Sequence, residues 1–163
     1  MVSQAMALCL VMNGRNTLAG ATKTANAVWE GSLMDGKGSI TSVGSGAISN
    51  LGVTWKARTE TEEYTSPEEL IAAANASCFA MALSHALSQA GNTAERLEVT
   101  AKCTFSLDNG PKITTMDLHV RGTVPGMDAD AFQQAAEQAG QNCPVSQALK
   151  GNVTHNISAE LAS

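Results

Sequence analysis

Two of the four cysteines, Cys78 and Cys143, stand where a thiol could take part in chemistry. Cys78 lies inside a long apolar segment with helical periodicity, where burial raises the pKa of a thiol and makes it unreactive. Cys143 precedes Pro144 at a predicted helix start, where free backbone N–H groups and the helix dipole favour a thiolate. Cys78 would therefore need a cation to react, and Arg58 could supply one. From the residues alone, two packed core thiols remain the alternative interpretation.

The remaining thiols and the central histidine have simpler interpretations. Cys103 alternates in phase with Val99 and Phe105, so we expect a packed core thiol. Cys9 lies in the N-terminal segment, and we expect it to be inert. His85 falls on an apolar stripe of the central helix, which favours a hydrogen-bonded core histidine.

The apolar segment around Cys78 has the start and stop signals of a long helix. Ser66 can cap it, with Pro67 at the first position and Glu69 three residues after the cap. The helical pattern continues to about Ala90, where Gly91 can end it. Because most of its sides are apolar, we expect this helix to be buried. One predicted apolar stripe consists of Ile71, Ala74, Cys78, Met81 and His85.

The segments before this helix have the pattern of short strands. A hairpin turn at 35–38 separates the strand candidates 23–31 and 39–43. Residues 53–58 form a further strand candidate, which Arg58 would end.

After the central helix, residues 97–107 and 116–124 alternate as two strands on either side of a turn. A second helix is expected from Ala129 to about Ala139, a short one after Cys143, and a last strand at 153–161. The order strands, helix, strands, helix, strand predicts an α+β fold with antiparallel sheets rather than a parallel βαβ array.

Length and composition are typical of one globular domain. The chain has 163 residues, 44% of them hydrophobic and 15% charged, and a formal net charge of −5. We expect a loosely ordered extension at 1–21 and a single domain at 22–163. The acidic balance argues against nucleic-acid and anionic-membrane partners, and no apolar run approaches the roughly 20 residues needed to span a bilayer. Four sparse cysteines favour a cytoplasmic location, where thiols stay reduced.

Three segments share their pattern with a known family. They are Ser66–Leu83 in the central helix, Cys143–Leu149, and Trp29–Gly31 together with Gly36–Gly38 near the start. With these motifs the chain resembles the OsmC/Ohr family, the osmotically inducible protein C and organic hydroperoxide resistance proteins. The second motif is closer to the OsmC branch, and the resemblance covers about residues 22–163.

The resemblance implies a thiol peroxidase that reduces organic hydroperoxides in oxidative or osmotic stress defence. By position, Cys78 would be the peroxidatic thiol and Cys143 the resolving thiol. Arg58 and Glu68 would match the arginine and glutamate that polarise the reactive sulfur. The implied structure is an intertwined homodimer in which antiparallel β-sheets wrap long buried central helices, with two active sites at the subunit interface. The implied reductant is a dithiol, such as a lipoylated protein, and no prosthetic group or metal is expected.

The chain departs from the resemblance at Asn75. The OsmC branch usually has histidine three residues before the helix cysteine, and here a neutral amide takes its place. Residues three apart share a helix face, so we expect Asn75 to lie beside Cys78. The departure bears on the tuning of the thiolate and on substrate preference, but leaves the cysteine pair intact.

The spacing of Glu68 and Cys78 constrains the site. They are ten residues apart, so their Cα atoms lie about 15 Å apart along one straight helix. One guanidinium does not easily bridge that distance. Either the opening turn bends, or Glu68 reaches the site of the partner subunit, and we favour the second interpretation, which makes the dimer obligatory.

Apolar side chains around Cys78 bear on the substrate. Ile71, Phe79 and Met81 would line an apolar pocket, which favours alkyl or lipid hydroperoxides over hydrogen peroxide.

Two other classes of protein compete with the peroxidase. One is a non-catalytic dimeric stress or ligand-binding protein whose cysteines only pack. The other is a metal-dependent hydrolase, for which Cys78, Cys143 and a histidine could form a zinc site. The spacing of these residues matches no compact zinc motif, so the second class is disfavoured.

Overall fold

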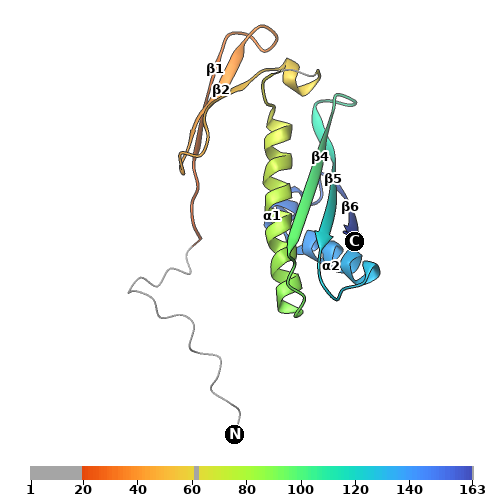
Figure 1. Cartoon of the computed structure of the whole chain (residues 1–163). Helices are drawn as coiled ribbons and strands as arrows, with labels where there is room; N and C mark the ends of the chain where they lie inside the picture. Colours follow the sequence, from red (N-terminus) through yellow and green to blue (C-terminus); the bar gives the residue numbers. More distant parts are fainter. Residues whose placement is uncertain (1–19, 61–62, 163) are drawn as a thin grey trace.

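The chain forms two β-sheets on either side of one long helix in a computed structural model that describes residues 20–60 and 63–162 (Figure 1). The first sheet contains β1 (Ala25–Glu30), β2 (Lys37–Val43) and β3 (Ser49–Val53), all antiparallel. The second sheet and the remaining helices lie on the other side of α1 (Pro67–Gln89). Cys9 and most of the predicted extension lie outside the described residues.

The sheet of β1, β2 and β3 stands as an exposed arm. All six residues of β1 are exposed, including the apolar Val28 and the ring of Trp29. A tight turn joins β1 to β2, in which the Gly36 N–H donates to the Ser32 carbonyl at 2.8 Å. An arm whose apolar side chains lack cover in the single chain has a surface available for a further contact.

The predicted strand at 53–58 is wrong beyond its first residue. The strand β3 ends at Val53, and Lys56–Arg58 form a single 3₁₀ turn, η1. The Thr54 hydroxyl accepts a hydrogen bond from the Ala57 N–H at 3.1 Å and so favours the turn over an extended chain. The turn directs Arg58 back toward the start of α1, where it forms an ion pair with Glu68.

The predicted limits of the central helix are confirmed. The Ser66 hydroxyl accepts a hydrogen bond from the Glu69 N–H at 3.2 Å, and Pro67 occupies the first helical position. At the other end Gly91 adopts a φ of +84°, a left-handed conformation that suits glycine and ends the helix.

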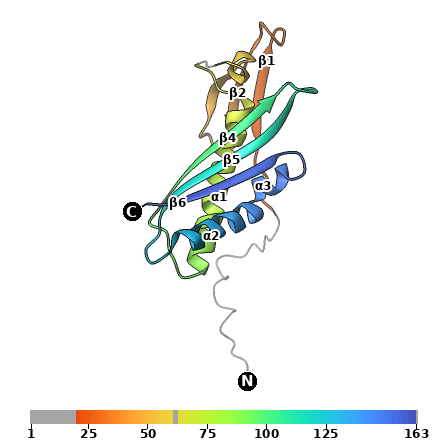
Figure 2. The same cartoon turned by 90° about the vertical axis from the view of Figure 1, so that its right-hand side faces the viewer.

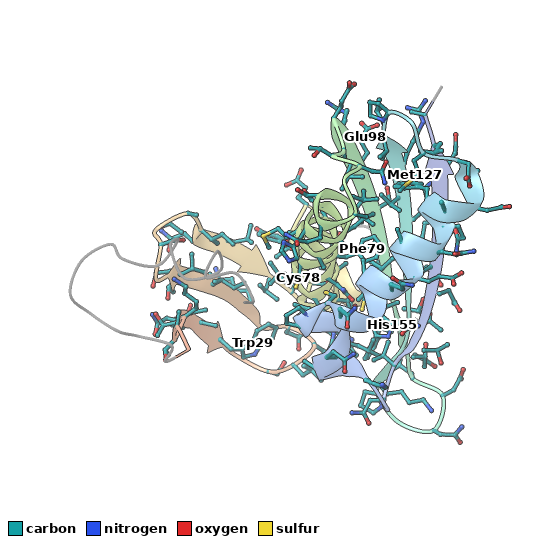
Figure 3. All side chains as sticks on the ribbon, turned by 90° about the horizontal axis from the view of Figure 1, so that it is seen from below. Trp29, Cys78, Phe79, Glu98, Met127 and His155 are labelled. Carbon is teal, nitrogen blue, oxygen red and sulfur yellow. The ribbon has the colours of Figure 1, made fainter. Side chains whose placement is uncertain are left out.

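Burial of α1 is one-sided, so the prediction of a helix buried on most sides is wrong for the single chain. Its buried residues are Glu68, Asn75, Phe79, Leu83 and Leu87, because the second sheet and the other helices cover this side alone. The predicted stripe lies elsewhere: Met81 is 66% exposed, and His85 is exposed rather than a core histidine. In Figure 3, Phe79 lies toward the second sheet, and Cys78 lies toward the β1–β3 arm.

The second sheet has the order β4 (Arg96–Ser106), β5 (Lys112–Thr123) and β6 (Thr154–Leu161). The β4–β5 pair is antiparallel, as predicted, whereas β6 joins β5 in parallel, which corrects the prediction of purely antiparallel sheets. The reason is the return path of the chain. Helices α2 (Ala129–Asn142) and α3 (Pro144–Leu149) carry it across one face of the sheet to the end where β5 began (Figure 2).

The core lies between this sheet and the three helices. Its members come from α1, β5 and α2 with their connections, and they share near-complete burial: Phe79, Leu83, Leu87, Met116, Leu118, Val120, Val124, Phe132, Ala136, Ala139 and Cys143. Gly140 lets α2 approach β6 closely, because a Cβ atom there would collide with the Ile157 side chain. Close packing of α2 fixes where the chain emerges at Cys143.

Contrary to the prediction from apolar runs, α1 is long and apolar enough to cross a membrane. Its 23 residues have a mean hydropathy of 1.5 in the most apolar window, and 22% of that window is buried. Core helices meet the same criterion, and α1 does pack against the second sheet. Length and hydropathy are therefore weak grounds for a membrane span here.

Candidate active site

The two cysteines singled out by sequence meet where α1 packs against the start of α3. Cys78 is half-buried near the middle of α1, and Cys143 is fully buried at the junction of α2 and α3. Both are free thiols, and the Cys78 thiol donates a hydrogen bond to the Cys143 sulfur. Two sulfurs within hydrogen-bond reach need only a small rearrangement to form a disulfide.

The surroundings shift the pKa values of the two thiols in opposite directions. Burial raises the pKa of Cys78 above its ordinary value, and the neighbouring Cys143 sulfur adds to the rise. Burial also opposes ionisation of Cys143, but hydrogen bonds from the Ser146 N–H, the Cys78 thiol, the Ser146 hydroxyl and the Val145 N–H together hold its pKa below the ordinary value. The first negative charge of the pair therefore belongs to Cys143, the direction that its place before Pro144 suggested.

Asn75 lies against the Cys143 sulfur, which the Cys78 thiol also contacts. Its side chain is fully buried, its Nδ2 donates to the Ser146 hydroxyl at 2.9 Å, and the same nitrogen lies 3.7 Å from the Cys143 sulfur. Helical spacing placed Asn75 correctly on α1, but the side on which the side chain finds partners depends on α3. Sequence periodicity contains no information about that packing.

Arg58 and Glu68 form a tight ion pair at the start of α1. The Arg58 Nη2 donates to one Glu68 oxygen at 2.6 Å, and its Nε contacts both oxygens at 3.1 Å. The Glu68 side chain is 7% exposed and the Arg58 side chain 25%. The guanidinium also lies over two aromatic rings, 4.3 Å from the Phe105 centroid and 5.3 Å from the Trp55 centroid.

This ion pair lies beside Cys103 and away from Cys78. It borders a cavity of about 320 Å³ at the start of α1, which Cys103 also lines. Burial, and to a lesser degree the charge of Glu68, raises the pKa of Cys103, so this thiol stays neutral. Because α1 continues unbroken from Pro67 to Gln89, Glu68 and Cys78 remain about 15 Å apart along the helix. Within one chain, the structure thus joins Arg58 to Glu68, and Cys78 to Cys143, as two separate pairs.

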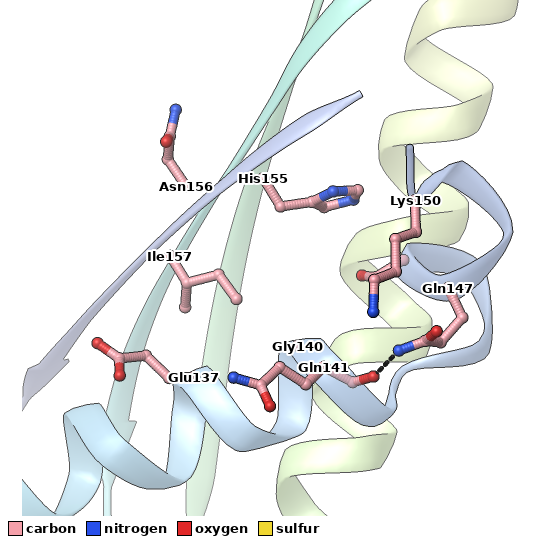
Figure 4. Close-up of a pocket in the computed structure, with 9 residues that line it drawn as sticks. Glu137, Gly140, Gln141, Gln147, Lys150, His155, Asn156 and Ile157 are labelled. Carbon is pink, nitrogen blue, oxygen red and sulfur yellow. Dashed lines mark hydrogen bonds between the residues drawn. The ribbon is translucent and has the colours of Figure 1, made fainter. Parts of the chain in front are cut away.

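A further cavity, which the sequence did not indicate, lies between α2, α3 and β6. It measures about 540 Å³, and Lys150 and His155 are among its lining residues (Figure 4). The His155 Nε2 is buried without a hydrogen-bond partner among the described residues. Ser146 also lines this cavity, which therefore reaches the far side of the polar cluster around Cys143. The only sequence signal was a histidine alternating with apolar residues on a strand.

No group of three or more metal-ligating side chains occurs in the part of the chain that the structure describes.

The chain thus has a two-sheet α+β fold. Two thiols are in contact between its central helix and the start of the short helix α3. Residues 60–158 match the family model described as OsmC-like protein, and the chain belongs to this family.

Individual relatives support this membership. The chain is 41% identical over 133 residues to the peroxiredoxin OsmC of Escherichia coli (strain K12), a match that covers 81% of this chain and 92% of the relative. It is 35% identical over 92 residues to the organic hydroperoxide resistance protein-like 2 of Staphylococcus epidermidis, covering 55% of this chain and 63% of that protein. A solved organic hydroperoxide resistance protein OsmC from Legionella pneumophila has the same fold, with a TM-score of 0.67 at 24% identity over 86% of this chain and 99% of that one.

Proposed function

We propose that this protein is a thiol-dependent peroxidase that reduces organic hydroperoxides to alcohols in oxidative or osmotic stress defence. The observation that carries the proposal is the contact between two free thiols with opposite pKa shifts, Cys78 and Cys143. The names of the relatives, a peroxiredoxin and a hydroperoxide resistance protein, support the same chemistry.

The reaction begins at Cys78, the more accessible of the two sulfurs. Its thiolate attacks one oxygen of the hydroperoxide, the O–O bond breaks, and the sulfur becomes a sulfenic acid while the alkoxide leaves and takes up a proton as the alcohol. The Cys143 thiolate then attacks the sulfenic sulfur, so that the S–S bond forms and hydroxide leaves as water. An external dithiol, such as a lipoylated protein, reduces this disulfide and is itself oxidised.

Cys78 needs a positive charge nearby, because burial and Cys143 both disfavour its thiolate. Arg58 of the same chain does not supply this charge, because it is bound to Glu68 at the start of α1. We infer that Arg58 of the partner subunit supplies this charge in a homodimer. The same guanidinium would stabilise the departing alkoxide, with Glu68 holding it in place.

The exposed side of α1 supports the dimer. Met81 is 66% exposed and lies on the side of the helix that the second sheet leaves uncovered. A second copy packing there would cover this apolar side and bring its own Arg58 toward Cys78.

The walls near Cys78 support an organic substrate. Ile71 is half-buried and Met81 is exposed, so both can contact a bound alkyl group. Phe79 does not contribute to such a wall, because it is fully buried in the core on the opposite side. Cumene hydroperoxide should therefore be consumed faster than hydrogen peroxide under identical conditions, since apolar walls favour a substrate with carbon.

The decisive experiment is thiol labelling at neutral pH. In the dimeric protein, we expect rapid and selective alkylation of Cys78, blocked by prior treatment with cumene hydroperoxide. The blocked protein should contain a Cys78–Cys143 disulfide in peptide mass spectrometry. Slow labelling of both thiols, without consumption of hydroperoxide, would instead favour a non-catalytic binding protein with packed cysteines.

A further inference from the structure

Asn75 is a polar side chain in an otherwise apolar row. It lies on the buried side of α1 with Phe79, Leu83 and Leu87, each four residues from the next, and its exposure is 0%. Its Oδ1 is buried and has no hydrogen-bond partner among the described residues. Burial of an amide with an unsatisfied acceptor costs free energy that an apolar side chain of the same size would not. Stability of the fold alone therefore does not account for an amide at this position.

The donor side of the same amide is fully engaged. Nδ2 donates to the Ser146 hydroxyl at 2.9 Å and lies 3.7 Å from the Cys143 sulfur. Ser146 in turn donates to that sulfur through its N–H and its hydroxyl. Asn75 thus contacts both the sulfur and the residue that supplies two of its other hydrogen bonds, and it links α1 to the start of α3.

The chemistry of an amide suits this position. Its N–H₂ group donates hydrogen bonds and does not ionise, so it favours an anionic sulfur at any pH without introducing a charge of its own. Cys78 lies one helical turn further along α1, and its thiol faces the same sulfur. Asn75 and Cys78 both project from α1 and both contact the Cys143 sulfur. The hydrogen bond from Asn75 therefore keeps this sulfur close to Cys78.

We propose that Asn75 is a positioning residue for Cys143, holding its sulfur toward Cys78 and ready to attack there. This inference rests on the proposed function and concerns its second step. In that step the Cys143 thiolate attacks the sulfenic sulfur of Cys78, the S–S bond forms, the S–O bond breaks, and hydroxide leaves and takes up a proton. Asn75 touches neither the hydroperoxide nor the oxygen that leaves, so it acts through Cys143.

The first test needs no peroxide. In Cys78→Ser protein, which keeps a hydroxyl donor beside Cys143, ¹³Cβ NMR of labelled cysteine follows ionisation of Cys143 with pH. Asn75→Leu, which keeps the volume and removes the donor, should raise the Cys143 pKa by about one pH unit. Asn75→Asp should raise it further because a carboxylate repels the thiolate, and Asn75→His, which restores an N–H donor, should recover part of the loss. An unchanged Cys143 pKa in both the Leu and Asp variants would overturn the proposal.

The second test measures the two oxidation steps separately in single-turnover experiments with cumene hydroperoxide. In Asn75→Leu, formation of the sulfenic acid should keep its rate, whereas formation of the disulfide should slow by about tenfold. Over-oxidation of Cys78 to the sulfinic acid should rise accordingly. Slowing of the first step alone would contradict the proposal. If the parent protein consumed no hydroperoxide, the proposed function would fail, while the NMR titration would still decide the contact of Asn75 with Cys143.

Two control variants separate positioning from stability. Leu87→Ala removes a buried side chain from the same row, far from the sulfurs, and should lower the melting temperature with the Cys143 pKa unchanged. Ser146→Ala removes the partner of Asn75, and combining it with Asn75→Leu should cost less than the sum of the two single changes. If Asn75→Leu does not fold, Asn75→Asp and Asn75→His carry the same comparison. Equal effects of Leu87→Ala and Asn75→Asp on the Cys143 pKa would reduce Asn75 to a packing residue.

Discussion

The middle and the beginning of α1 hold different kinds of chemistry. The middle carries the two thiols, and the beginning carries an ion pair whose guanidinium is stacked on aromatic rings. In each region the group that carries the charge has hydrogen-bond partners. The Cys143 sulfur accepts hydrogen bonds from its neighbours, and Arg58 donates to the Glu68 carboxylate. A straight helix keeps the two regions about 15 Å apart, so the thiol pair and the ion pair stay separate within one chain. Under the proposed function, this difference makes the positive charge at Cys78 a question of assembly rather than of residue content.

The largest expected effect comes from mixing two inactive variants. Cys78→Ser should abolish turnover, and Arg58→Ala should lower it by about 100-fold because the thiolate and the alkoxide lose their charge partner. If Arg58 acts across the interface, co-refolded dimers of the two variants contain one intact site, and turnover should return to about a quarter of the parent value in a random mixture. Steady-state consumption of cumene hydroperoxide measures this recovery.

Complementation also has a clear negative outcome. If Arg58 acted on the Cys78 of its own chain, every mixed dimer would lack either the thiol or the cation in each site. The mixture would then show no more activity than the two separate samples, and the two halves of α1 would have to meet by a bend within one chain.

Removal of the charge on Glu68 should have a smaller effect. In Glu68→Gln the amide keeps the volume but loses the charge-assisted contacts with Arg58, so we expect hydroperoxide turnover to fall by about tenfold. Glu69→Gln is a matched control on the same turn, because Glu69 is exposed and its carboxylate accepts a hydrogen bond from the Thr65 hydroxyl instead of pairing with Arg58. A loss of the same size in both variants would show that general charge, and not the ion pair, matters at this end of α1.

The pH dependence of stability tests the thiol pair in the middle of α1. The folded pKa of Cys143 lies below the ordinary thiol value of about 8.5, so the unfolded chain binds the extra proton and stability should rise with pH up to that value. The folded pKa of Cys78 lies above it, so stability should fall again at higher pH, where the unfolded chain loses that proton first. Urea unfolding of reduced protein should show the rise in the parent and not in Cys143→Ser. A rise that survives in Cys143→Ser would assign it to another group.

The smallest expected effect concerns the aromatic rings below the guanidinium. Phe105→Leu removes the ring whose centroid lies 4.3 Å from Arg58 and should weaken its positioning by about 0.5–1 kcal/mol, or two- to fivefold in turnover. Kinetics with cumene hydroperoxide measures the change, and Phe132→Leu in the core, away from Arg58, is the size-matched control. Equal losses in the two variants would assign the effect to general packing.

Signals within a few residues predicted most of the helices and strands. Features that depend on contacts between distant segments could not be predicted in this way. The cap at Ser66 and the stop at Gly91 depend on neighbouring residues, so the limits of α1 could be predicted. The parallel direction of β6 depends on α2 and α3 crossing the sheet, and the strand's own alternation is the same in either direction. The sequence predicts a strand that ends at Arg58, because the turn at Lys56–Arg58 has no strong sequence signal.

The site was predictable to a similar extent. The contact between Cys78 and Cys143 followed from the family resemblance, and the acidity of Cys143 followed from its place before Pro144. The contact of Asn75 with Cys143 could not follow from either, because it depends on which side of α1 meets α3. The prediction that Glu68 reaches the site of the partner subunit stays a prediction, and the complementation experiment tests it through Arg58, its ion-pair partner.

The parallel strand β6 has a consequence for the order in which the protein is made. Cys143 reaches Cys78 only after α2 has crossed the sheet, and β6, the last strand, then closes over β5 and the returning helices. Contacts between such distant segments form late in folding, because a long loop must close first. A nascent chain on the ribosome therefore exposes Cys78 before Cys143 has been made, and the two sulfurs become neighbours only after α2 has been added.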